Sequence, residues 1–355
     1  MSHPHTRFEH LRAAVTQGAS PLELYGLSPA AAAWSLARLW FELRRPLVLV
    51  TPGAGPQTGF LRDLHFFLAG YQETFHPDDR PTDLYTFPAY ENLSFVELTP
   101  DLQTASARLE TAYALATRTG RPMIVTSGIA LAQSLPPRDR LAAVTEYLVV
   151  GQELDREKFL GHLAAGGYTR RPLVEEKGDF SVRGGVIDFF PPLSDYPVRL
   201  EFWGDTIESI RQFNPASQRS AKHLEDVIVL PVSEVYLDRQ TQKMASHRLR
   251  SVKSAKVLEY LQRREHFPGI ERYLPYFHER TETLGDYLPD NCLVALWDPL
   301  NLKQELDAYL ARADQERPEE EEAWVNCLEV MSRFQTLRCH AVPFTDQTSA
   351  GARVF

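Results

Sequence analysis

Two neighbouring stretches of the sequence decide the architecture of its middle part. The first reads Lys177-Gly-Asp-Phe-Ser-Val-Arg-Gly-Gly-Val-Ile-Asp-Phe-Phe-Pro-Pro192, and the second reads Tyr196-Pro-Val-Arg-Leu-Glu-Phe-Trp-Gly-Asp-Thr-Ile-Glu-Ser-Ile-Arg211. Both predict strands, and the second alternates in the way that is typical of a strand with one buried face. Its buried face would carry Val198, Leu200 and Phe202, and its other face would carry Arg199, Glu201 and Trp203.

Glycines mark the turns of this strand-rich part. Gly204-Asp205 can form a two-residue hairpin loop that sends the chain back into the next strand. In the first stretch, alternation places Arg183 on the face opposite to Phe180 and Val182. The pair Gly184-Gly185 permits a β-bulge or a close approach of two backbones.

Arg183, Arg199 and Trp203 are therefore predicted to share one face of a sheet. Tryptophan and arginine gathered on one face have the composition of a protein-binding hot spot. The alternative is that Trp203 packs beneath a neighbouring domain, because large aromatic side chains are mostly covered. On the residues alone, both interpretations stay open.

The residues before this part predict alternating helices and strands. The continuous apolar run Pro46-Leu-Val-Leu-Val50 is typical of a buried parallel strand. Further strands are expected at 82–87 and 122–126, and helices at 29–44, 60–69 and 102–118. This alternation predicts an α/β layer.

The residues after Leu230 return to a mixed pattern. Helices are expected at 240–264, 300–313 and 319–334, with a strand at 292–297. We therefore predict three sections: an α/β domain at 1–144, a strand-rich α+β domain at 145–230, and a second α/β part at 231–355 that packs on the first domain.

Composition narrows the class of protein. A chain of 355 residues with 43% hydrophobic and 24% charged residues suggests two or three globular domains. The net charge of -9 opposes the basic balance of an autonomous nucleic-acid-binding protein, so weak DNA binding at most is expected. Three widely spaced cysteines and the lack of a long apolar run favour a soluble cytoplasmic protein without a membrane anchor.

One glycine-rich stretch raises the question of nucleotide chemistry. Gly53, Gly55 and Gly59 follow a predicted strand and precede a predicted helix, where a phosphate-binding loop would lie. The stretch lacks the Lys-Ser/Thr pair of a P-loop, and Pro56 removes an amide donor. We predict a plain turn, and a nucleotide-binding or hydrolysing enzyme that uses the Gly53 to Gly59 loop remains the alternative. No catalytic residue, metal ligand or cofactor is predicted.

The strand motifs carry a resemblance to a known family. Together with Gly166-Gly-Tyr, Leu173-Val-Glu-Glu and the segment 213–219, they follow in order and spacing the module shared by the nucleotide excision repair protein UvrB and the N-terminal part of Mfd, the transcription-repair coupling factor. The resemblance implies a degenerate P-loop-type, helicase-like parallel-sheet domain with an inserted smaller strand-rich α+β domain.

UvrB carries its P-loop where this sequence reads Gly26-Leu-Ser-Pro-Ala-Ala-Ala-Ala33. Ala32 and Ala33 stand in place of the lysine that reaches the phosphates and the hydroxyl residue that ligates magnesium. The resemblance therefore implies a P-loop that has lost ATP hydrolysis, and a chain that is not an enzyme.

The resemblance also implies a partner. In this family the middle domain binds UvrA, and the contact residues correspond to Arg183, Arg199 and Trp203, the last where the family usually has phenylalanine. Tryptophan keeps the aromatic surface and adds an N–H donor. We expect truncation of any of the three to weaken UvrA binding and to leave folding nearly unchanged.

The function implied is that of a non-enzymatic adaptor in transcription-coupled nucleotide excision repair. It would recruit UvrA where RNA polymerase has stalled. Contacts with RNA polymerase and duplex DNA, and ATP-dependent translocation, are expected of domains outside this chain, which would be an N-terminal portion or a reduced homologue. Direct DNA binding in the manner of UvrB is disfavoured by the net charge of -9.

Overall fold

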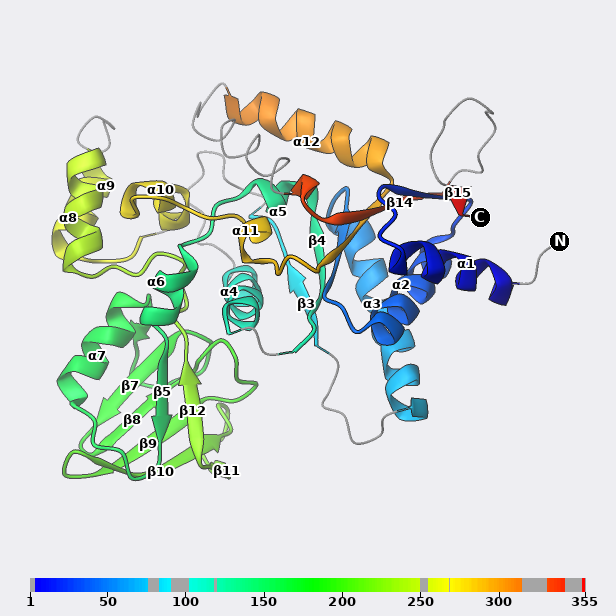
Figure 1. Ribbon diagram of the computed structural model, residues 1–355. Coiled ribbons are helices and arrows are strands. Elements are labelled where there is room, and N and C mark those ends of the chain that lie inside the picture. The colour runs from blue at the N-terminus through cyan, green and yellow to red at the C-terminus, as the bar shows by residue number, and fades with distance from the viewer. Residues whose placement is uncertain are drawn as a thin grey trace. The chain divides into compact units, whose positions relative to one another are not determined.

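The computed structural model describes residues 4–75, 83–90, 102–117, 120–249, 255–267, 269–314, 331–341 and 353–354. The chain forms two compact units, each assembled from segments far apart in the sequence (Figure 1). Unit 1 comprises Met1–Ala89, Arg118–Gln133 and Thr283–Phe355, and unit 2 comprises Tyr90–Thr117 and Ser134–Glu282.

Unit 1 is built on a seven-stranded parallel sheet with the order β15-β1-β14-β13-β2-β4-β3. Its strands are β1 (Leu22–Tyr25), β2 (Leu47–Thr51), β3 (Leu84–Phe87), β4 (Met123–Ser127), β13 (Leu293–Trp297), β14 (Gln335–His340) and β15 (Arg353–Val354). Every residue of β2 and β4 is buried, as expected of central parallel strands covered on both faces.

The helices of unit 1 are α1 (Pro4–Thr16), α2 (Pro29–Leu43), α3 (Ala54–Phe75), α5 (Gly128–Ala132), α11 (Leu284–Tyr287) and α12 (Pro299–Asp314). Apolar side chains of α2 and α3, among them Leu36 and Phe60, pack with Leu47 and Leu49 of β2 in one buried cluster. The strand and the two helices that were predicted around it therefore form the core of this unit.

One sequence prediction in unit 1 is wrong. The residues expected to form a glycine-rich turn are helical, because α3 begins at Ala54 and contains both Gly55 and Gly59. Pro56 lies in the first turn of α3, where a backbone N–H has no acceptor four residues earlier, so proline is tolerated there. Most of the stretch from Gly53 to Gly59 therefore forms the first turns of α3, and the lack of a phosphate-binding role there stays a prediction.

Unit 2 contains a six-stranded sheet of order β11-β10-β9-β8-β7-β6 and a two-stranded sheet of β5 and β12. The strands are β5 (Glu146–Val149), β6 (Thr169–Arg170), β7 (Asp179–Arg183), β8 (Val186–Phe189), β9 (Val198–Trp203), β10 (Thr206–Phe213), β11 (Ser220–Leu224) and β12 (Asp226–Val229). All neighbours are antiparallel except β6 and β7. A parallel α/β sheet and a separate strand-rich part confirm the predicted fold class.

The helices of unit 2 are α4 (Leu102–Ala116), α6 (Arg138–Ala143), α7 (Arg156–Ala165), α8 (Arg239–Arg248), α9 (Ala255–Arg263), the 3-10 helix η2 (Ile270–Tyr273) and α10 (Leu274–Phe277). The single helix predicted at 240–264 is thus described as two helices, α8 and α9. Most of the helix predicted at 319–334 lies outside the described residues.

The compact units do not follow the three predicted sections one by one. Unit 2 includes α4 and residues 231–282 in addition to the strand-rich section, whereas β13 and β14 of the third section pair with strands of the first. A domain boundary at residue 144 or 230 stays a prediction.

Unit 2 buries a complete ion pair. The Nε atom of Arg108 on α4 lies 2.6 Å from Oε1 of Glu234, and the two side chains are 0% and 1% exposed. The guanidinium also stacks on the ring of Tyr90 at 4.7 Å and donates from Nη2 to the carbonyl of Ser134. This pair ties α4 to the segment that follows β12.

A second carboxyl group lies beside the pair. Glu271 of η2 accepts a hydrogen bond from Ser233 Oγ (3.0 Å), while its Oε2 atom is buried without a partner among the described residues. Burial, together with the nearby Glu234 carboxylate, raises the pKa of Glu271 to about 7. The neutral acid is therefore the form that this environment favours.

The raised pKa of Glu271 predicts a specific pH dependence of stability. Because the folded pKa lies above that of an unfolded glutamate, the stabilisation is complete below about pH 4.5 and is lost as the pH rises through 7. We expect Glu271→Gln to remove this pH dependence. Between pH 5 and 8 the free energy of unfolding of the variant should therefore rise relative to that of the parent protein. Urea unfolding of both proteins at several pH values measures the difference, and parallel curves would contradict the prediction.

Candidate protein-binding site

The six-stranded sheet of unit 2 has one face in the core and one face outside it. Alternate residues of β7 to β10, among them Phe180, Ile187, Leu200 and Ile210, pack with Phe159 of α7 in a buried cluster. The intervening residues define what we call the outer face. It comprises Ser181, Arg183, Val186, Asp188, Arg199, Glu201, Trp203, Ser209 and Arg211.

Trp203 is a highly exposed residue of the outer face. It ends β9, and 79% of its surface is accessible. Val198 and Leu200 of the same strand are fully buried, so the predicted alternation is confirmed. The described residues of unit 2 leave Trp203 uncovered, and the alternative of packing beneath another domain stays open.

The two glycine turns position this face. Trp203 pairs with Thr206, and Gly204 between them has a φ of +62°, so Gly204-Asp205 forms the predicted hairpin loop. Arg183 pairs with Val186, so Gly184-Gly185 is a second hairpin loop rather than a bulge. A side chain on Gly185 would come within 3.3 Å of the Phe202 carbonyl, which explains the need for glycine there.

One end of the outer face is covered by residues 171–176, which we call the cover segment. The Pro172 carbonyl accepts hydrogen bonds from Ser181 Oγ (3.2 Å) and from Arg183 Nη2. Val174 packs with Phe190 and Phe213 in a small buried cluster. The cover segment leaves the Trp203 end of the face open and explains why Ser181 is buried.

Arg199 is held in a strong pair. Its Nε and Nη2 atoms donate to Asp188 at 2.7 and 2.8 Å, and its guanidinium stacks over Phe213 at 4.8 Å. The side chains of Arg199 and Asp188 are 20% and 6% exposed. The hydrogen bonds with Asp188 raise the pKa of Arg199. The expectation that truncating Arg199 leaves folding nearly unchanged does not fit this pairing, because a buried carboxylate would lose its cation.

The other arginines of the face differ from Arg199 in their partners. Arg211 reaches Glu201 at 3.2 Å, and Ser209 donates to the same carboxylate at 2.6 Å. Arg183 is exposed and donates to a carbonyl, that of Pro172. Arg199 and Arg211 thus pair with carboxylates, whereas the hydrogen bond described for Arg183 goes to a neutral carbonyl.

The structure brings the three residues proposed from the sequence to one face, and it adds two that sequence reasoning missed. In the strand register, Arg199 and Trp203 flank Glu201, which lies two strands from Arg183. Arg211 pairs with Arg199 across β9 and β10, but the register shifts between Ile207 and Ser209, so alternation counted on from Trp203 would have placed Arg211 on the buried face. Leu173 of the cover segment is exposed, and no periodicity in its loop marks it. The role of these residues in UvrA binding stays a prediction.

The stretch predicted to be a degenerate P-loop lies at the start of α2. Gly26 has a φ of +71°, and Ser28 caps the helix by accepting a hydrogen bond from the amide of Ala31. Ala32 and Ala33 are buried in the core of unit 1. These two positions supply packing where a P-loop supplies a lysine and a hydroxyl.

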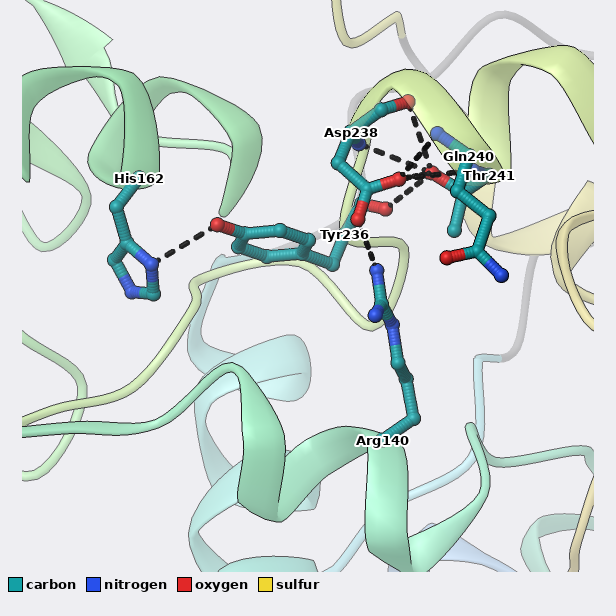
Figure 2. Close-up of polar contacts among 6 residues, drawn as sticks. All are labelled: Arg140, His162, Tyr236, Asp238, Gln240 and Thr241. Atoms are coloured by element: carbon teal, nitrogen blue, oxygen red, sulfur yellow. Dashed lines mark hydrogen bonds and ion pairs between the residues drawn. The ribbon is translucent and has the colours of Figure 1, made fainter. Parts of the chain in front are cut away.

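A polar network links α6 and α7, which precede the six-stranded sheet in the sequence, to the start of α8, which follows it (Figure 2). Tyr236 Oη lies 2.9 Å from Nδ1 of His162 on α7, and Arg140 of α6 pairs with Asp238, which caps α8. Burial lowers the pKa of His162 and raises that of Tyr236 to about 12, so both side chains are neutral at pH 7. We assign this network a structural role, since its groups satisfy one another.

The described residues contain no helix with the length and apolar character that a membrane crossing requires.

Comparisons with known proteins agree with this architecture. Residues 147–235 match the protein family described as the UvrB interaction domain. The matched range contains α7, all six strands of the six-stranded sheet, β12 and all of β5 except Glu146. The strand-rich part is therefore similar to UvrB interaction domains.

Relatives extend the match over most of the chain. This chain is 36% identical to the transcription-repair-coupling factor of Myxococcus xanthus over 296 residues, which cover 79% of this chain and 24% of that protein. It is 27% identical to the same factor from Bacillus subtilis (strain 168), over 82% of this chain and 25% of that protein. The chain is thus homologous to the N-terminal, UvrB-like region of the transcription-repair coupling factor Mfd, and it spans about a quarter of the length of these relatives.

Proposed function

We propose that this chain is the UvrA-recruiting adaptor module of a transcription-repair coupling factor. The observation that carries the proposal is that the exposed Trp203 shares the outer face with arginines, in a domain that matches the UvrB interaction domain. In this proposal UvrA contacts Arg183, Arg199 and Trp203. RNA polymerase and duplex DNA would be bound by other parts of a full-length factor.

The chemistry of the outer face supports protein binding. An exposed indole supplies a large apolar contact area at a low cost in conformational entropy, and arginine pairs with carboxylates through two donors at once. Trp203 lies at the open end of the face, away from the cover segment, and Arg183 lies two strands across the sheet. A partner can therefore reach both without displacing the core.

We expect Trp203→Ala to weaken UvrA binding by about 2 kcal/mol, or about 30-fold, as is typical of a hot-spot tryptophan. The melting temperature should stay within about one degree of the parent value, because an exposed side chain contributes little to the core. Calorimetric titration with UvrA from the same organism measures the affinity, and thermal unfolding followed by circular dichroism measures the stability.

Phe66 of α3 provides a matched control, since it is a comparably exposed aromatic residue in unit 1. Phe66→Ala should bind UvrA like the parent protein. Unchanged affinity of Trp203→Ala would refute the proposed surface, and an equal loss in both variants would show that the effect is not specific to the outer face.

We also propose that this chain does not use the degenerate P-loop for ATP. The buried methyl groups of Ala32 and Ala33 offer neither a positive charge for phosphate nor an oxygen for magnesium. Fluorescent ATP analogues should show no saturable binding at micromolar concentrations. Saturable binding that ATP competes away would contradict this part of the proposal.

A further inference from the structure

Leu173 is an apolar side chain that the cover segment holds in solvent beside the proposed site. Its surface is 41% accessible, whereas the next residue, Val174, is buried. A leucine this exposed is unremarkable on a loose loop. What distinguishes Leu173 is that the backbone on both sides of it is fixed to the outer face.

Several separate contacts hold the backbone on both sides of Leu173. On one side, the Pro172 carbonyl accepts hydrogen bonds from the outer-face residues Ser181 and Arg183. On the other side, Val174 packs with Phe190 and Phe213, and its carbonyl accepts a hydrogen bond from Gln218 Nε2 (3.2 Å).

The amides that follow are fixed as well. The backbone N–H groups of Glu175 and Glu176 donate to Asp179 Oδ2 at 3.2 and 3.0 Å. Little backbone entropy therefore remains to be lost when a partner binds Leu173, and preorganisation of this kind increases affinity.

The neighbouring charges indicate what the partner presents. Arg199 faces Asp188 and Arg211 faces Glu201, so these two arginines already have carboxylate partners. Arg183 shares the Pro172 carbonyl with Ser181 and is exposed next to Leu173. A complementary surface would place a carboxylate at Arg183 and an apolar contact at Leu173.

We propose that Leu173 is a second apolar anchor of the UvrA-binding surface, next to Arg183 and separate from Trp203. The inference rests on the proposed function. The matching surface of UvrA then carries an acidic side chain for Arg183 and apolar contacts for Leu173 and Trp203. The cover segment thereby acts as part of the binding site in addition to closing one end of the sheet.

The test measures UvrA affinity for Leu173→Ser and Leu173→Met in the full chain, beside Trp203→Ala. Leu173→Ser should bind at least about fivefold more weakly, and Leu173→Met should bind like the parent protein, because methionine keeps the apolar contact. Val150→Ser is the control, since Val150 is a similarly exposed aliphatic residue of unit 2 outside the outer face. Circular dichroism melting should give one melting temperature for all of them.

The outcomes separate this inference from the proposed function. Loss of affinity in Trp203→Ala with none in Leu173→Ser overturns the second anchor and leaves the proposed function standing. A parent protein that does not bind UvrA overturns both. Equal losses in Leu173→Ser and Val150→Ser, or a loss that follows a lowered melting temperature, also overturn the anchor, whereas a selective loss rescued by methionine supports it.

Discussion

Replacing Arg108 with alanine should lower the free energy of unfolding by about 3–5 kcal/mol, the largest effect we expect from a single substitution. The change leaves Glu234 buried without its cation, and it removes the guanidinium from the ring of Tyr90. Burial already raises the pKa of Glu234, so the unpaired side chain would take up a proton more readily. Urea unfolding followed by circular dichroism measures the loss.

Two further variants show whether the burial of the pair is the cause. Arg263 pairs with Glu259 on the exposed surface of α9, and Arg263→Ala should cost well under about 1 kcal/mol because such pairs contribute little. The double variant Arg108→Met with Glu234→Leu should recover most of the loss, since it leaves no unpaired charge in the core. If Arg108→Ala is no worse than Arg263→Ala, the pair does not stabilise unit 2.

Four strands of the parallel sheet, β2, β3, β4 and β13, could be predicted from local patterns, whereas β1, β14 and β15 were not predicted. The apolar run that ends at Val50 predicts a buried strand, and β2 is found at Leu47–Thr51 with every residue buried. The order of the strands could not be predicted, because β13 and β14 come more than 240 residues after β2 and join its sheet through pairings that no local pattern encodes. Glycine and proline near Gly55 favoured a turn, and helix packing overrode that preference.

The candidate site likewise has features that the local sequence predicts and features that depend on contacts between distant segments. Period-two alternation predicts which way Arg199 and Trp203 point, because it depends on the strand alone. It cannot predict that Asp188 lies opposite Arg199, since this depends on the register between β8 and β9. The fixed position of Leu173 depends on hydrogen bonds from β7, which the sequence of its own loop does not reveal.

Arg199→Ala should lower the free energy of unfolding by about 3 kcal/mol, at the lower end of the range for broken buried pairs because the arginine is partly exposed. The loss comes from Asp188, which is left nearly buried without the two donors that now hold it. Arg183→Ala is the matched comparison and should be close to neutral, since it removes one hydrogen bond to an exposed carbonyl. Equal stability of the two variants would refute the structural role of Arg199.

The double variant Arg199→Ala with Asp188→Asn separates stability from recognition. Asparagine removes the buried charge, so most of the stability should return. UvrA affinity should remain low in the double variant, because the guanidinium that faces the partner is still missing. If affinity returns together with stability, Arg199 acts by holding Asp188 and the sheet in place, and Arg183 and Trp203 are then the direct contacts among the three.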